Sequence, residues 1–192
     1  MGEYINPIDS YNKRIEAISE MLKYYHVTNQ EVLENTPRRF LKFMDEYTSA
    51  LKNDYTDFKA FPKDSNQMVV MECSFYSLCE HHLLPYFGKV FIGYLPKTEV
   101  LGVSKLIKLT QHLFKKPSIQ ERVTEEIATT LMKNLDTAGV AVIVKGLHLC
   151  VAMRYREGLI TTASMHGNFK HNPFAKEEFL SYVTPRLNEF KF

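Results

Sequence analysis

Residues 140–155 read VAVIVKGLHLCVAMRY, a run rich in valine, isoleucine and other residues that favour extended structure. We therefore predict a strand along this run. Successive side chains of a strand point to opposite faces, so Leu147 would face the core. His148, Cys150 and Arg154 would share the other face. The run thus predicts a strand with one apolar face and one face that carries chemistry.

Two segments nearer the N-terminus have a similar composition. Residues 68–76 and 89–95 are rich in valine, isoleucine, tyrosine and phenylalanine, and we predict that both are strands. Between the second and third strand segments, apolar residues at helical spacing follow Ser104 and Ser118. Serine is a favoured N-cap residue, so two helices are predicted to begin at these positions.

The first 55 residues or so contain apolar residues at helical spacing and no run that resembles a strand. Thr28, with a glutamate three residues later, is predicted to cap one short helix. Thr36, followed by Pro37 at a first-turn position, is predicted to open another. This part of the chain is therefore expected to be all helical.

A last helix is predicted to begin at Asn172-Pro173 and to end before Pro185. The order of elements indicates an α+β fold with an antiparallel sheet. The change of pattern near residue 60 separates an N-terminal helical arm, residues 1–60, from a sheet-bearing domain, residues 61–192.

The composition limits the possible partners. The 192 residues include 24 lysines and arginines and 22 acidic residues, a net charge of +2 that is too balanced for coating nucleic acid or an anionic membrane. No apolar run approaches the roughly 18 residues that span a bilayer, and the start lacks the pattern of a secretory signal. We expect a cytoplasmic protein with neither a nucleic-acid partner nor a membrane partner.

Three cysteines cannot form a closed set of disulfides, so metal binding or reactive thiols are the natural interpretations. Cys79 and His82 are separated by two residues, a spacing that lets both side chains reach one ion from a turn. If Cys150 converges on them, the S, N, S donor set selects zinc and leaves a fourth position for water, as in catalytic zinc sites. His81 and His148 would then remain as free imidazoles for proton transfer.

Each candidate also has a purely structural interpretation. A buried cysteine is usually an inert small side chain, which is how we interpret Cys73. A structural zinc would need a fourth ligand, and His81 could supply it. Glu121 could complete a capping box with Ser118, or it could accept the paired N–H groups of a guanine ring.

A basic stripe runs along the helix predicted after Ser104. Lys105, Lys108 and His112 follow one another at steps of three and four residues. Such a stripe is often a solvated helix face. The free N–H groups at a helix start can also bind phosphate, so Ser104 and Lys105 are candidate phosphate ligands.

Motifs spread along most of the chain resemble those of the GTP cyclohydrolase I family. They are Thr36-Pro37-Arg38-Arg39, Ser77-Leu78-Cys79-Glu80-His81-His82, Gly88-Lys89-Val90, Gly93-Tyr94-Leu95-Pro96, Gly102-Val103-Ser104-Lys105-Leu106, Gln120-Glu121-Arg122, His148-Leu149-Cys150 and Glu177-Glu178-Phe179-Leu180. The resemblance implies the tunnelling fold, an antiparallel sheet backed by two helices with an N-terminal helical arm. It also implies a homodecamer of two pentameric rings, with active sites at subunit interfaces.

The resemblance also implies roles for individual residues. It makes zinc the cofactor and GTP the substrate, with His81 and His148 as catalytic proton carriers. The implied zinc ligands are Cys79, His82 and Cys150. The implied substrate-binding residues are Glu121 and Gln120 for guanine, and Ser104, Lys105, Lys108, Arg154 and a neighbouring subunit's Arg39 for the triphosphate.

The implied reaction is hydrolysis of the GTP imidazole ring at C8, release of formate and rearrangement to 7,8-dihydroneopterin triphosphate, which opens folate and pterin biosynthesis. His148 would protonate N7. Some residues depart from the family pattern: Lys108, Glu72, Tyr155 and His166. Because none of them is an implied zinc ligand, we expect these departures to affect substrate affinity more than the reaction itself.

Three alternatives are weighed against this interpretation. A relative of similar fold could act on another purine or pterin, as the nitrile reductase of queuosine synthesis does with a nucleophilic cysteine and no zinc. A zinc nucleoside deaminase would need Pro-Cys-x-x-Cys and His-x-Glu segments, which the chain lacks. A non-enzymatic, zinc-stabilised interaction protein would have four metal ligands, and Glu121→Ala would affect no turnover.

Overall fold

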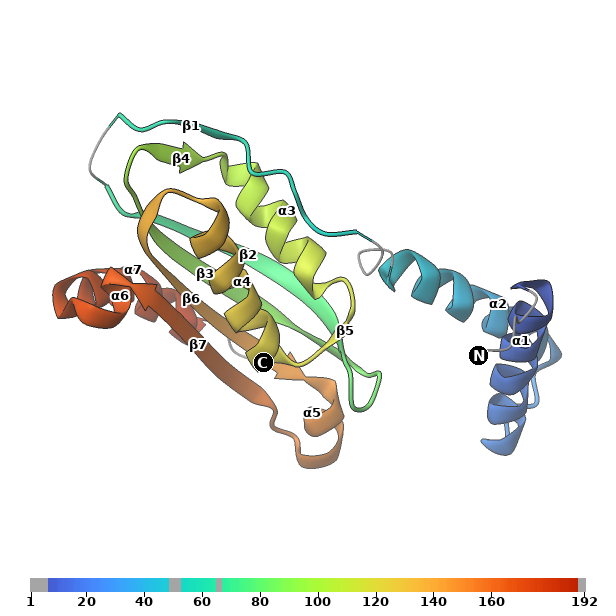
Figure 1. The fold of residues 1–192 in the computed structure, drawn as a ribbon. Helices are drawn as coiled ribbons and strands as arrows, with labels where there is room; N and C mark the ends of the chain where they lie inside the picture. Colours follow the sequence, from blue (N-terminus) through green and yellow to red (C-terminus); the bar gives the residue numbers. More distant parts are fainter. Residues whose placement is uncertain (1–6, 49–52, 65–66, 190–192) are drawn as a thin grey trace, which may run out of the picture. The chain divides into compact units, whose positions relative to one another are not determined.

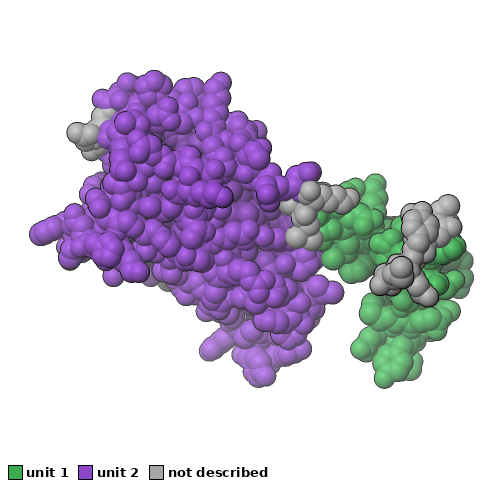
Figure 2. All heavy atoms as spheres, in the orientation of Figure 1, with its two compact units in different colours: residues 1–49 green, residues 50–192 purple. Residues whose placement is uncertain are grey.

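The computed structural model describes residues 7–48, 53–64 and 67–189. The chain divides into two compact units, Met1–Ser49 and Ala50–Phe192, which are drawn in different colours in Figure 2. The boundary predicted near residue 60 stays a prediction. None of the described helices is both long enough and apolar enough to cross a membrane.

The first unit consists of two helices that pack against each other, α1 (Pro7–Tyr24) and α2 (Gln30–Tyr47). Sequence analysis predicted two short helices where α2 is continuous, and that prediction is wrong. The cap is Asn29, whose side chain accepts from Val32 N at 3.4 Å. Pro37 lies inside α2 and lacks the N–H that would bond to the Leu33 carbonyl. The Ser19 hydroxyl donates to that carbonyl at 3.4 Å instead, so the carbonyl keeps a hydrogen-bond partner.

The second unit is built on a five-stranded sheet in the order β5-β2-β3-β6-β7 (Figure 1). Its long strands are β2 (Val69–Cys79), β3 (Pro85–Pro96), β6 (Thr137–His148) and β7 (Leu159–Gly167), and neighbouring pairs are antiparallel. The two-residue β5 (Pro117–Ser118) pairs in parallel with the end of β2. A separate small sheet joins β1 (Ala60–Pro62) and β4 (Glu99–Leu101). The predicted α+β fold with an antiparallel sheet is confirmed.

Two helices cover one face of this sheet, α3 (Val103–Phe114) and α4 (Gln120–Asn134) (Figure 1). Their inward side chains are fully buried against the strands, as the helical spacing predicted; they include Leu106, Leu109, Val123, Ile127 and Leu131. Burying one such side chain contributes about 1.5–3 kcal/mol. This layer is the main core and holds the start of α4 against the sheet.

The short α6 (Asn168–His171) and the longer α7 (Pro173–Glu189) cover the opposite face. Phe179 is fully buried there above Gly93, where an added Cβ would lie 2.5 Å from the Phe179 ring. The prediction that this helix ends before Pro185 is wrong, because α7 includes that residue. The Lys145 ammonium donates to the Leu187 carbonyl at 2.6 Å, so the end of α7 is anchored to the sheet beyond the proline.

The two serines expected to cap the central helices do not cap them. The N-cap of α3 is Gly102 and that of α4 is Ile119, and neither helix start has a side-chain cap bond. Ser118 is buried with its hydroxyl 2.6 Å from the Tyr86 hydroxyl, so the oxygen is engaged inside the core. The capping box predicted for Ser118 and Glu121 is therefore not formed.

The strand predicted over residues 140–155 ends early. β6 stops at His148, and α5 (Leu149–Tyr155) follows directly. The helix returns the chain toward β7, and His148 N donates to the Gly158 carbonyl at 2.9 Å across the turn. Consequently Cys150 and Arg154 lie on a helix, and the prediction that they share a strand face with His148 is wrong.

Candidate active site

The candidate site lies where β2 and β6 end and where α4 and α5 begin. Cys79 is the last residue of β2, His148 is the last residue of β6, and Cys150 is in the first turn of α5. One ligand atom from each of these side chains lies within 4.8 Å of the other two, and all three residues are buried. Residues that are distant in the sequence therefore form one Cys–His–Cys cluster.

The donor set of this cluster suits a metal ion. Burial raises the pKa of the Cys150 thiol, and the neighbouring Cys79 raises it further. Two thiols held together in a buried place ionise readily only with a compensating cation. Two sulfurs and an imidazole nitrogen are the ligands that zinc accepts in proteins, so the residues present fit zinc.

The turn after β2 adds two more histidines. His82 lies beside the first cysteine, with Nδ1 3.7 Å from Cys79 Sγ, and the neighbouring His81 is exposed. The backbone N–H of Leu83 donates to the Cys79 carbonyl at 2.8 Å and closes the turn, with Leu83 at a φ of 53°. The predicted donors His82 and Cys150 thus both lie near Cys79, while His148 is the histidine within the 4.8 Å cluster.

His148 is enclosed on several sides. Its Nε2 lies 3.0 Å from Gln120 Oε1, and its ring stacks on the Tyr86 ring at 4.4 Å between centroids and 15° between planes. Burial lowers the pKa of His148, and the nearby Glu121 charge opposes this shift. The folded protein therefore favours a neutral imidazole that is held in one orientation.

The start of α4 places three consecutive residues in different surroundings. Gln120 is fully buried against His148, and Glu121 is exposed. Arg122 makes a two-bond pair with Glu80 in the turn, with Nη1–Oε2 at 2.8 Å and Nη2–Oε1 at 3.2 Å. This pair connects α4 to the turn that carries His81 and His82.

The predicted phosphate ligands are found on other elements. Ser104 and Lys108 are exposed on α3, and Arg154 is exposed near the end of α5. Lys105 pairs with Asp57, and the hydrogen bond from its ammonium is the main reason that the pKa of Asp57 is lowered. Arg39 belongs to the first unit and pairs there with Glu31, at 2.7 Å between Nη2 and Oε1.

Sequence reasoning missed several neighbours of the candidate site. Tyr86 faces His148 across the β3–β6 pair, and only the register of that pair could have revealed the stacking. The contact of Gln120 with His148 depends on how α4 packs on β6. The partners Asp57 and Glu80 are common charged residues without a motif of their own, although Glu80 lies between Cys79 and His81.

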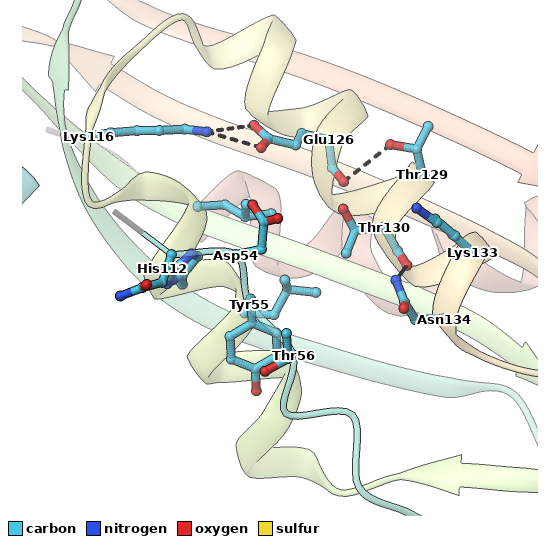
Figure 3. Close-up of a pocket in the computed structure, with 13 residues that line it drawn as sticks. Asp54, Tyr55, Thr56, His112, Lys116, Glu126, Thr129, Thr130, Lys133 and Asn134 are labelled. Carbon is cyan, nitrogen blue, oxygen red and sulfur yellow. Dashed lines mark hydrogen bonds and ion pairs between the residues drawn. The ribbon is translucent and has the colours of Figure 1, made fainter. Parts of the chain in front are cut away.

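A separate pocket of about 570 Å³ lies between α3, α4 and residues 53–56 (Figure 3). The Lys116 ammonium at its rim is held by both carboxylate oxygens of Glu126 at 3.0 Å. The lining includes His112 but none of the residues predicted to bind metal or substrate. The candidate site is therefore the buried cluster at the end of the sheet and not this pocket.

Fold and site together define a class of protein: an α+β protein with a Cys–His–Cys cluster, suited to a metal ion, at one end of an antiparallel sheet. Comparison with known proteins specifies the family. The family model for GTP cyclohydrolase I matches residues 14–184, so the chain belongs to the GTP cyclohydrolase I family.

Individual relatives agree with this assignment. GTP cyclohydrolase 1 of Sulfurihydrogenibium sp. is 39% identical over 158 residues, which are 81% of this chain and 84% of that protein. The enzyme of the same name from Aquifex aeolicus is also 39% identical over 158 residues, covering 81% of this chain and 86% of that protein. The Drosophila melanogaster GTP cyclohydrolase 1 is 36% identical over 165 residues, covering 82% of this chain and 51% of that protein.

Two of the positions that the sequence analysis interpreted as departures from the family pattern have partners within the chain. The Glu72 carboxylate lies 2.9 Å from the Lys89 ammonium. His166 Nε2 lies 3.1 Å from a Glu125 oxygen and 3.0 Å from the Ser164 hydroxyl. Lys108 and Tyr155 are exposed. These contacts give Glu72 and His166 structural roles on the sheet, apart from the Cys–His–Cys cluster.

Proposed function

We propose that the protein is a zinc-dependent GTP cyclohydrolase I. It hydrolyses the imidazole ring of GTP at C8, releases formate and forms 7,8-dihydroneopterin triphosphate, the first step toward folate and other pterins. The observation that carries the proposal is the buried cluster of Cys79, Cys150 and His148, with His82 beside Cys79, in a chain of this family. The protein works in the cytoplasm.

Cys79, His82 and Cys150 hold the zinc ion in this proposal. The 3.7 Å approach of His82 Nδ1 to Cys79 Sγ supports the choice of His82. His148 has one ring nitrogen engaged by Gln120, which leaves a single nitrogen for chemistry. When bound, zinc would supply Lewis acidity that lowers the pKa of a coordinated water toward neutrality.

His148 carries protons between solvent and the guanine ring. A protonated His148 donates to N7, which makes C8 more electrophilic and lets water add there. Its lowered pKa supports this role, because an imidazolium in a buried place gives up its proton readily. His81, exposed in the neighbouring turn, exchanges protons in the second hydration that releases formate.

Glu121 selects guanine. Its carboxylate accepts the N1–H and one 2-amino hydrogen of the base, a pairing that adenine cannot offer. Two observations support this role: no capping bond occupies the start of α4, and the Glu121 charge reaches His148.

Basic side chains bind the triphosphate. Lys105, Lys108 and Arg154 supply charge, Ser104 supplies a hydroxyl at the start of α3, and Arg39 comes from a neighbouring subunit. For Lys105 to bind phosphate, the phosphate must displace Asp57 from its ammonium.

The active enzyme is a homodecamer of two pentameric rings. The sheet supports such an assembly, because β7 lies at one edge and most of β2 faces the other edge beyond the two-residue β5. Open strand edges can pair with edges of further copies. Active sites at the subunit boundaries would then receive Arg39 from a neighbour.

Zinc content and GTP turnover of five proteins test the proposal. The parent should hold one zinc per chain and convert GTP to formate and a pterin that fluoresces after oxidation. Cys150→Ser and His82→Ala should lose zinc and turnover. His148→Ala should keep its zinc and lose about 100-fold or more in kcat, the size expected for a lost acid–base group.

Cys73→Ser is the matched control, because Cys73 lies outside the cluster and its replacement should leave zinc content and turnover unchanged. Full zinc and activity in Cys150→Ser would overturn the ligand set. Zinc loss in His148→Ala together with zinc retention in His82→Ala would exchange the roles of the two histidines. A zinc-loaded parent that releases no formate from GTP would refute the proposed reaction.

A further inference from the structure

Gln120 is a fully buried polar side chain at the first residue of α4. Its Nε2 donates to the carbonyl oxygens of Val144 at 3.2 Å and Ile160 at 3.1 Å. A carbonyl oxygen cannot donate a hydrogen bond, so the nitrogen end of the amide must face these two oxygens. The orientation of the Gln120 amide is therefore fixed by its surroundings.

The oxygen end of the same amide faces His148. Gln120 Oε1 lies 3.0 Å from His148 Nε2. An amide oxygen only accepts, so His148 Nε2 must carry a hydrogen in this contact. In the neutral ring, Nδ1 is then the nitrogen without a hydrogen, whose lone pair can accept a proton.

A directional chain of hydroxyl groups supports the nitrogen end. The Thr124 hydroxyl donates to the Gln120 backbone carbonyl at 2.7 Å. The 2.6 Å contact between the Thr162 and Thr124 hydroxyls must therefore use the hydrogen of Thr162. The Thr162 oxygen remains an acceptor for Gln120 Nε2, at 3.1 Å. The amide is thus held from both ends.

Two other contacts hold the pair in place. An added Cβ at Gly146 would lie 2.5 Å from Gln120 Oε1, so the glycine makes room for the amide oxygen. The Tyr86 ring stacks on His148, and the Tyr86 hydroxyl lies 2.6 Å from Ser118 Oγ. Tilting the imidazole out of this plane would break the stacking and the Gln120 bond together.

We infer that Gln120 is a positioning residue for the reaction: it keeps His148 in the Nε2–H form and so assigns proton exchange with the substrate to Nδ1. The inference rests on the proposed function for the part that His148 plays in turnover. In this role the Gln120 side chain acts through His148, which differs from the contact with guanine that the family resemblance implies for it.

The ¹⁵N spectrum of histidine-labelled, zinc-loaded protein tests the tautomer directly. The His148 signals are those missing from His148→Asn. At a pH where His148 is neutral, the parent should show Nε2 protonated and Nδ1 unprotonated, as one species. Gln120→Met keeps the length of the side chain and removes its acceptor, so it should give a mixture of the two tautomers.

Kinetics separate a positioning role from a substrate-binding role. Gln120→Met should lower kcat about tenfold and leave KM for GTP within about twofold, because only the acid–base group is disturbed. In a His148→Asn background the same substitution should lower kcat no further. A raised KM with unchanged kcat would place Gln120 at the substrate and overturn the inference.

Two further variants keep the test decisive if Gln120→Met folds poorly. Gly146→Ala displaces the amide without removing it and should shift the His148 tautomer in the same direction. Thr110→Val removes another fully buried hydroxyl, one that bonds the Leu106 carbonyl at 2.9 Å, and should leave the His148 spectrum unchanged.

The outcomes distinguish this inference from the proposed function. An unprotonated Nε2 in the parent, or a single Nε2–H species in both Gln120→Met and Gly146→Ala, overturns the inference whatever the turnover. Full GTP turnover in His148→Asn contradicts the proposed role of His148, while the spectra still report what Gln120 does to the ring.

Discussion

Lys105 combines an expected role in phosphate binding with an ion pair inside the chain. Its ammonium contacts the Asp57 carboxylate, and the Tyr55 hydroxyl donates to its backbone carbonyl at 3.1 Å. The side chain is only 18% exposed, so its charge is largely removed from water. Asp57 compensates that charge and holds the Lys105 ammonium near the start of α3.

The pair predicts how stability depends on pH. The folded state holds the pKa of Asp57 below its usual value near 3.9, mainly through the hydrogen bond from Lys105. Its contribution to stability is therefore present above pH 4 and is lost as the pH falls through the folded pKa. The free energy of unfolding should differ between the parent and Asp57→Asn at neutral pH, and the difference should shrink below about pH 4.

Urea unfolding between pH 2 and pH 7 measures this difference. Lys105→Gln removes the same pair from the other side and should show the same loss at neutral pH. A difference between the parent and Asp57→Asn that stays constant down to pH 2 would show that the pair is not its source.

The sequence predicted the contacts of some individual residues better than those of others. The spacing of Cys79 and His82 indicated a turn with two donors, and His82 Nδ1 lies 3.7 Å from Cys79 Sγ. The proximity of Cys150 to Cys79 was also predicted, although through a strand that is not there. The pairing of Gln120 with His148 was out of reach, because it depends on the packing of two elements 28 residues apart.

At the scale of elements, strand composition was the most informative signal. Alternate residues of β3 and β6 point to opposite faces, and helices bury both faces, which explains the nearly continuous apolar run at 140–144. Helix boundaries were predicted less well. Ser118 suits an N-cap by type, but the buried Tyr86 hydroxyl engages it, and tertiary contact overrides the local preference.

The packing of α7 gives a prediction at this scale. Phe179→Ala should lower the free energy of unfolding by about 3–5 kcal/mol, because it leaves a cavity above Gly93 in a fully buried layer. Phe174→Ala on the same helix should cost less than about 0.5 kcal/mol, since Phe174 is 80% exposed. Urea unfolding of both variants makes the comparison. Equal losses would show that α7 does not contribute to the core through Phe179.

At the scale of the whole molecule, both core clusters and the Cys–His–Cys cluster belong to residues 50–192. The helices α1 and α2 form their own unit, with Leu41 and Pro37 buried in it. The sequence predicted a helical arm followed by a sheet domain. The two compact units meet at residue 49, and Tyr55 and Phe58 pack on the main core although they precede the strands, while the boundary predicted near residue 60 stays a prediction.

Together with the zinc site proposed above, this division predicts that a chain of residues 50–192 folds and binds zinc. Its zinc content per chain and its near-ultraviolet circular dichroism should match those of the full chain. Its KM for GTP should rise, because Arg39 is missing. The full chain with Arg39→Ala is the control for that last effect and should show a similar KM with intact zinc. Loss of zinc from the shortened chain would mean that the first unit supports the metal site.

The space left by Gly146 has a consequence for how sequences of this kind can change over evolutionary time. Any side chain at that position would compete with the amide oxygen of Gln120 for the same volume. The added Cβ would lie 2.5 Å from that oxygen. A substitution at either position alone would remove the hydrogen bond that orients the His148 ring. Among descendants of this sequence, glycine at one position and glutamine at the other should be inherited as a pair.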